Sequence, residues 1–94
     1  MDVRYHKDPD TGLPHIYNHG IREDEVEEVL RGSGDDYPAE RDSRMKLGQT
    51  AAGRYLQVIY SPDEDGIGVF VISAFELKGK SKKAFRRRQR RKRR

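Results

Sequence analysis

Residues 47–74 carry almost all of the period-two apolar pattern in the chain. Two runs in this segment, 55–60 and 67–74, are dominated by β-branched and aromatic residues, and each is bounded by Gly, Pro or Asp. A shorter run opens with Met45 and Leu47. The connections between the runs are short, which suits antiparallel hairpins better than crossovers. The pattern therefore predicts three adjacent antiparallel strands.

Alternation along the predicted strands assigns their faces. In the run 55–60, Leu56, Val58 and Tyr60 point the same way, so we expect them to face the core. In the run 67–74 neither set of alternate residues is polar. This run therefore predicts a central strand that is covered on both sides.

Two helical patterns precede the strands. Pro14 suits the first position of a helical turn and Gly20 would end it, which predicts a short helix over 14–19. Residues 23–30 begin with three acidic residues and carry an apolar stripe at i, i+3 and i+4, and Gly32 follows them. We expect this second helix to cover one face of the sheet.

These elements predict an α+β fold in which two N-terminal helices pack on a three- to four-stranded antiparallel sheet. A fourth strand would be an edge strand, formed by residues 2–6 or near 36–37. Residues 1–79 would form one compact domain. Residues 80–94 would form a basic C-terminal helix or tail that Phe85 holds to the body, and beyond about Arg88 we expect this helix to fray.

The charge is divided sharply along the chain. Residues 1–77 contain all 16 acidic residues against eight basic ones, a net charge of −8. Residues 78–94 contain twelve Lys and Arg and no acid. A block of like charge typically acts as an interaction arm for polyanions. Arg outnumbers Lys in this block, and the Arg guanidinium is the better fork for phosphate.

Composition restricts the compartment and the chemistry. No apolar run approaches the roughly 18 residues that a membrane span needs, and the first residues have no apolar signal region. The chain has no cysteine, which excludes disulfides and thiolate metal sites. We therefore expect a cytoplasmic protein with no membrane partner.

Several short motifs occur in an order that is similar to that of a known family. They are Asn-His-Gly-Ile at 18–21, the acidic helix 23–30, Leu-Gly-Gln-Thr-Ala-Ala-Gly-Arg-Tyr-Leu at 47–56 and Val-Ile-Ser-Ala at 71–74, followed by a basic final helix. The chain resembles BrnT-type toxins over roughly residues 1–90 and also resembles their uncharacterised relatives. The resemblance implies a RelE-like fold, ribonuclease activity and a cognate antitoxin in a type II toxin–antitoxin pair.

Two positions depart from the family pattern. The family usually has Arg where this chain has Phe75, and a basic residue where it has Asn18. If those cations bind the scissile phosphate, this protein has either moved that function to Arg44, Lys46 or Arg54, or lost it.

Metal-free RNA cleavage needs a base, an acid for the leaving 5′-oxygen and cations for the charged transition state. His19 could supply the acid or base, because imidazole exchanges protons near neutral pH. Arg41 or Arg44 could clamp phosphate, and Tyr60 or Glu40 could assist proton transfer. The nucleic-acid-binding candidates are all basic: Lys46, Arg54, Lys82, Lys83, Arg86, Arg87, Arg88, Arg90 and Arg91.

Each of these residues also has an ordinary structural interpretation. His19 could simply bond the last carbonyls of its helix, and Tyr60 could be a core or strand-end aromatic. Arg41 and Arg44 could be ordinary solvated charges near an acidic surface. His15 and His19 are four residues apart, a spacing that can chelate a metal on a helix, yet no carboxylate stands with them. We therefore expect no metal and no cofactor.

Three functions remain open at this point. The first is a ribonuclease toxin with RNA as substrate and an antitoxin as partner. The second is a non-catalytic RNA-binding protein, in which the Arg-rich tail supplies the affinity. The third is an interaction protein whose tail docks on an acidic partner or on its own acidic helix.

Overall fold

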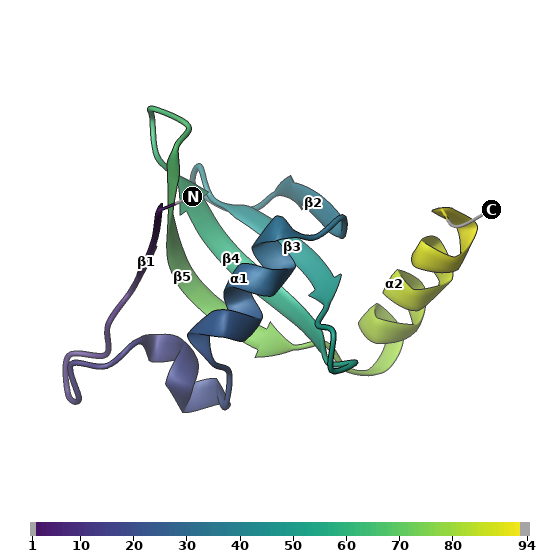
Figure 1. Cartoon of the computed structure of the whole chain (residues 1–94), viewed down its shortest axis with the longest axis horizontal. Helices are drawn as coiled ribbons and strands as arrows, with labels where there is room; N and C mark the ends of the chain where they lie inside the picture. Colours follow the sequence, from purple (N-terminus) through teal and green to yellow (C-terminus); the bar gives the residue numbers. More distant parts are fainter. Residues whose placement is uncertain (1, 93–94) are drawn as a thin grey trace.

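The computed structural model describes residues 2–92 and is organised around a five-stranded mixed sheet (Figure 1). The strand order is β1-β5-β4-β3-β2, with β1 parallel to β5 and every other neighbouring pair antiparallel. A register shift interrupts the β4–β5 ladder between Ile59 and Tyr60. The strands are β1 Asp2–Tyr5, β2 Asp35–Pro38, β3 Arg44–Gln49, β4 Tyr55–Pro62 and β5 Gly68–Glu76.

Three helical segments flank this sheet. A 3-10 helix, η1, spans His15–His19, and the α-helices α1 and α2 span Glu23–Arg31 and Gly79–Lys92. Helix α1 crosses one face of the sheet, and α2 lies at the end of the sheet away from β1 (Figure 1). Within residues 2–92, no helix is long and apolar enough to cross a membrane.

The main core lies between α1, η1 and the first face of the sheet. Leu56, Val58 and Tyr60 are buried there, which confirms the face predicted from alternation. Val29 of α1 packs directly above β3, because a Cβ at Gly48 would lie only 3.0 Å from Val29 Cγ1. A glycine on β3 thus lets the helix approach the sheet closely.

The second face of the sheet is only partly covered. Helix α2 covers the part over β3 and β4, whereas Ile72 and Phe75 of β5 remain 39% and 36% exposed. Strand β5 is central, as predicted, but the expected cover on both of its faces is wrong. An apolar pattern along a strand indicates only that part of the strand is covered. Here α2 lies to one side of β5 (Figure 1), so part of that strand's second face stays exposed.

The predicted fold class is wrong in its sheet. The sheet has five strands and is mixed, because β1 pairs in parallel with β5 and β2 adds to the other edge along β3. Both additional strands have four residues, and the sequence of β2 is Asp-Asp-Tyr-Pro. Such short edge strands are specified by backbone pairing with a neighbour and carry little alternation of their own.

The predicted pair of N-terminal helices is also wrong, since α1 is the single α-helix that precedes the sheet's long strands. The predicted helix over 14–19 is the 3-10 segment η1. Pro14 is its N-cap, with extended backbone, and Gly20 ends it with φ +70°. The five residues between them are too few for a regular series of α-helical hydrogen bonds, and a 3-10 turn suits short pieces of this kind.

Candidate nucleic-acid interface

Helix α2 docks on the second face of the sheet through a small apolar cluster. Phe85 is 2% exposed and packs with Leu47 of β3 and with Leu77. The Tyr55 ring of β4 meets the Phe85 ring edge to face, with 6.0 Å between the centroids. These contacts confirm that Phe85 holds the basic segment to the body.

A half-buried carboxylate provides a second anchor for α2. Asp35 of β2 is 13% exposed in its side chain and accepts bonds from Arg88 Nε at 2.5 Å and from Lys92 Nζ at 2.9 Å. Burial alone would raise the pKa of the Asp35 carboxyl, but the bonds from Lys92 and Arg88 outweigh it and lower that pKa below its ordinary value. The expected fraying beyond Arg88 is therefore wrong as far as Lys92, and the predicted tail residues 93–94 lie outside the described residues.

The remaining cations of α2 form a continuous basic surface on its outer side. Phe85 and Arg88 are three residues apart and share the face that contacts the sheet. Lys83, Arg87 and Arg91 follow one another at spacings of four, so they line the opposite side, and all three are exposed. Within residues 2–92 none of the three forms an ion pair. The helix contains no acidic residue that could neutralise them.

A polar hollow opens between α2 and the ends of β3 and β4. Lys82 Nζ lies 5.1 Å, and Arg86 Cζ 5.9 Å, from the centroid of the Tyr55 ring, so both cations contact the ring face. The hollow has a volume of about 210 Å³. It is lined by one aromatic ring, two amides and two guanidinium groups, from Gln49, Tyr55, Arg86, Gln89 and Arg90.

Two of the predicted catalytic residues lie together on the α1 side of the sheet. Tyr60 Oη donates a hydrogen bond of 2.6 Å to Asp36, and Arg44 Nε donates one of 3.0 Å to the other oxygen of the same carboxylate. Burial, followed by the bond to Asp36 and its charge, raises the pKa of Tyr60 to about 12. The phenol therefore stays protonated at neutral pH and serves as a hydrogen-bond donor to Asp36.

The other predicted acid–base residue lies elsewhere. The ring of His19, at the end of η1, is 4.5 Å from the ring of Phe75, centroid to centroid. Phe75 pairs with Gln57 in the β4–β5 ladder, so it lies on the face opposite to Tyr60. His19 and Tyr60 thus approach opposite faces of the sheet, and the structure does not bring them into one site.

His19 is part of a row that contains all three histidines of the chain. His19 Nε2 lies 3.3 Å from His15 Nε2, and the His15 and His6 ring centroids are 5.9 Å apart. The row runs between the rings of Phe75 and Phe70 along the second face. No group of three or more metal-binding side chains that could hold an ion occurs within residues 2–92.

Arg41 occupies the turn between β2 and β3. Its φ is +52°, an uncommon backbone conformation for a residue with a side chain. It lines a hollow of the second face together with Glu40, Ile59 and Ile72. Arg41 thus lies on the other side of the sheet from Arg44 and Tyr60, although Arg41 and Arg44 are only three residues apart in sequence.

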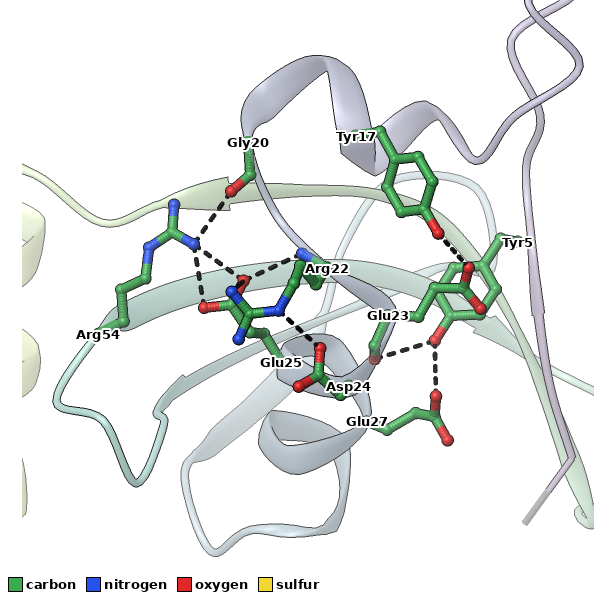
Figure 2. A network of polar contacts seen from close by, with 9 residues as sticks. All are labelled: Tyr5, Tyr17, Gly20, Arg22, Glu23, Asp24, Glu25, Glu27 and Arg54. Carbon is green, nitrogen blue, oxygen red and sulfur yellow. Dashed lines mark hydrogen bonds and ion pairs between the residues drawn. The ribbon is translucent and has the colours of Figure 1, made fainter.

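Lys46 and Arg54 are engaged within the body. Lys46 Nζ donates to the carbonyl oxygens of Leu30 and Gly32 at 2.8 and 2.6 Å, which satisfies the end of α1. Arg54 Nη1 contacts both carboxylate oxygens of Glu25 and the carbonyl oxygen of Gly20, as Figure 2 shows. Both cations lie on the α1 side, away from the basic surface of α2.

Three residues that line the interface were not among the sequence candidates: Gln49, Tyr55 and Gln89. Tyr55 carries the clearest signal, because alternation places it on the face opposite to Leu56 and Val58. A half-buried aromatic on that face must pack against some other element. Phe85, the one aromatic residue of the basic segment, was the available partner.

A family comparison covers the segment from η1 to the end of β5. Residues 15–76 match the family described as Domain of unknown function (DUF4258), and α2 lies outside the matched segment. No curated protein and no solved structure matches the chain. Because the match spans more than half of the 94 residues, the chain belongs to the DUF4258 family.

Proposed function

We propose that the protein binds RNA through the outer surface of α2. The observation that carries this proposal is a helix of 14 residues that has no acid, docks on the sheet through Phe85 and Asp35, and exposes Lys83, Arg87 and Arg91 on its other side. Anchoring matters because it fixes the basic surface relative to Tyr55 and the adjoining strands. A tethered but undocked arm would have no such fixed geometry.

The charge division supports a polyanion as the partner. The body carries net negative charge, so it repels phosphate, and attraction is confined to α2 and the residues that follow it. Neutralising six phosphates of a single strand predicts a slope of about −4 in a plot of log affinity against log salt concentration. Affinity should therefore fall steeply as salt is raised.

The test compares two double variants with the same change in net charge. Arg87→Gln with Arg91→Gln removes two cations from the outer surface of α2, and Lys7→Gln with Arg31→Gln removes two from the body. By fluorescence anisotropy with single-stranded RNA, the α2 variant should bind more weakly, with a salt slope smaller by about 1.4. Equal losses in the two variants would show that net charge alone matters and would contradict the proposed surface.

The second candidate function is metal-free RNA cleavage at the histidine row. Its specific observation is the contact of His15 Nε2 with His19 Nε2 at 3.3 Å, beside the ring of Phe75. Two imidazoles can share the roles of general acid and general base. An adjacent aromatic ring can stack on a nucleobase of the RNA. The similarity to BrnT-type toxins supports this candidate, and under it a cognate antitoxin would be the protein partner.

Total RNA incubated with the purified protein in EDTA tests this second candidate. Cleavage should persist in EDTA, fall in His15→Ala and His19→Ala, and be retained in Arg44→Ala, because Arg44 bonds Asp36 on the other face of the sheet. RNA that stays intact with the unmodified protein, in an assay where binding is detected, would leave binding by α2 as the function.

A further inference from the structure

The polar hollow beside α2 has the chemistry of a nucleobase site. It is lined by Gln49, Tyr55, Arg86, Gln89 and Arg90. Its volume of about 210 Å³ is below the roughly 300–1,000 Å³ of pockets for drug-sized ligands and suits one flat ring system. Aromatic and guanidinium planes stack bases, and amides bond their polar edges.

The two amides have bonding capacity to spare. Gln49 Nε2 donates to the Gly53 carbonyl oxygen and Gln89 Nε2 to Asp35, each at 3.4 Å, which is long for a hydrogen bond. Within the part of the chain that the structure describes, no protein donor bonds the side-chain oxygen of either amide. Each amide can thus present both an acceptor and a donor, which is the combination that the Watson–Crick edge of a base requires.

The ring of Tyr55 is held in place for stacking. Phe85 packs against its edge, and Lys82 and Arg86 lie over its face. Arg86 and Arg90, which both line the hollow, place positive charge beside it, as the phosphates that flank a bound base require. The hollow therefore joins directly onto the basic surface of α2.

We infer that this hollow takes one unpaired nucleobase, which packs against the planar groups of Tyr55 and Arg86 and bonds Gln49 and Gln89, so that the protein prefers single-stranded RNA. This inference rests on the proposed RNA binding by α2 and adds a base contact to it. A base within a duplex is already stacked and paired, and it cannot enter the hollow.

The experiment separates the base from the phosphates. Fluorescence anisotropy compares a single-stranded RNA of about 10 nucleotides with the same strand made abasic at its internal positions. The unmodified protein should bind the intact strand at least about fivefold more tightly, the effect of stacking one base. In Gln49→Ala with Gln89→Ala this preference should shrink, while affinity for the abasic strand stays unchanged.

The matched control is Gln57→Ala, which removes an amide from β4 on the same face but outside the hollow. It should keep the full preference for the intact strand. Equal binding of intact and abasic strands by the unmodified protein would overturn the base site and leave binding by α2 standing, as would a full preference in the double amide variant. Failure to bind either strand would overturn both.

Discussion

Arg54 Nη1 lies 2.9 and 3.0 Å from the two carboxylate oxygens of Glu25, a residue of the first turn of α1 that is 6% exposed in its side chain (Figure 2). The same carboxylate accepts a bond from the backbone N–H of Arg22, the N-cap residue of α1. One buried acid thus joins the start of α1 to the residue that precedes β4.

Replacing this acid should change the response of the protein to acid. Burial would raise the pKa of the Glu25 carboxyl, but the Arg22 N–H and Arg54 lower it below 4.5. Its stabilising contribution is therefore complete above pH 4.5 and is lost as the pH falls through the folded-state pKa. Glu25→Gln should lower the free energy of unfolding by about 2 kcal/mol at pH 7 and reduce its decline below pH 4.5, measured by urea unfolding at several pH values.

Glu64→Gln is the matched control, because Glu64 lies in the exposed hairpin turn between β4 and β5 and forms no ion pair within residues 2–92. It should retain the stability and the acid response of the unmodified protein. An acid response in Glu25→Gln as steep as in the unmodified protein would show that other carboxyls control it.

A second prediction concerns the anchor of α2. Asp35→Asn removes the negative charge that bonds Arg88 and Lys92. The free energy of unfolding should fall by only about 1 kcal/mol, because both cations are partly solvated. The C-terminal half of α2 should exchange its amide hydrogens faster, whereas the strands should be unchanged. Asp10→Asn, in an exposed turn, is the control. Unaltered protection of α2 in Asp35→Asn would mean that Phe85 alone fixes the helix.

The central strands and α1 could be predicted from the sequence because their own residues specify them. Leu56 and Val58 alternate with partly exposed neighbours, and Val26 and Val29 lie on one side of a helix that begins with acids. Strands β1 and β2 could not be predicted with their pairing, because the order β1-β5-β4-β3-β2 depends on which edge each short segment meets.

Some features of the candidate site could likewise be predicted from the sequence, and others could not. The basic segment and its apolar anchor Phe85 are visible in the sequence, since no other aromatic residue occurs there. The separation of His19 from Arg44 and Tyr60 was not predictable, because residue type does not tell which face of the sheet a helix-end side chain such as His19 approaches. Lys46 and Arg54 look like available cations until the carbonyls and the carboxylate they bond are known.

A glycine next to β2 should be intolerant of any side chain. A Cβ at Gly34 would lie 1.8 Å from the Leu47 carbonyl oxygen, which is backbone of the neighbouring β3. Gly34→Ala must therefore push β2 away from β3 and should cost more than about 2 kcal/mol in the free energy of unfolding. Ser33→Ala, one residue earlier, should cost little. Equal denaturation midpoints for the two variants would contradict the close approach of Gly34 to β3.

The hydrogen bond between Tyr60 and Asp36 predicts how the stability of the protein changes at alkaline pH. Burial and the Asp36 carboxylate raise the pKa of Tyr60 from 10.0 to about 12, because a phenolate would be poorly solvated and would face a like charge. The contribution of Tyr60 is therefore complete below pH 10 and is lost as the pH rises toward 12. Tyr60→Phe should be less stable than the unmodified protein by about 1 kcal/mol at pH 8, and the difference should shrink above pH 10.

Tyr37→Phe, at an exposed position of β2, should match the unmodified protein across this range. The ring of Tyr60 packs in the core. Phenylalanine keeps that ring, so the variant tests the hydrogen bond of the hydroxyl alone. A stability difference that stays constant from pH 8 to 12 would show that the hydroxyl of Tyr60 does not titrate with folding, and the bond to Asp36 would then not be its main interaction.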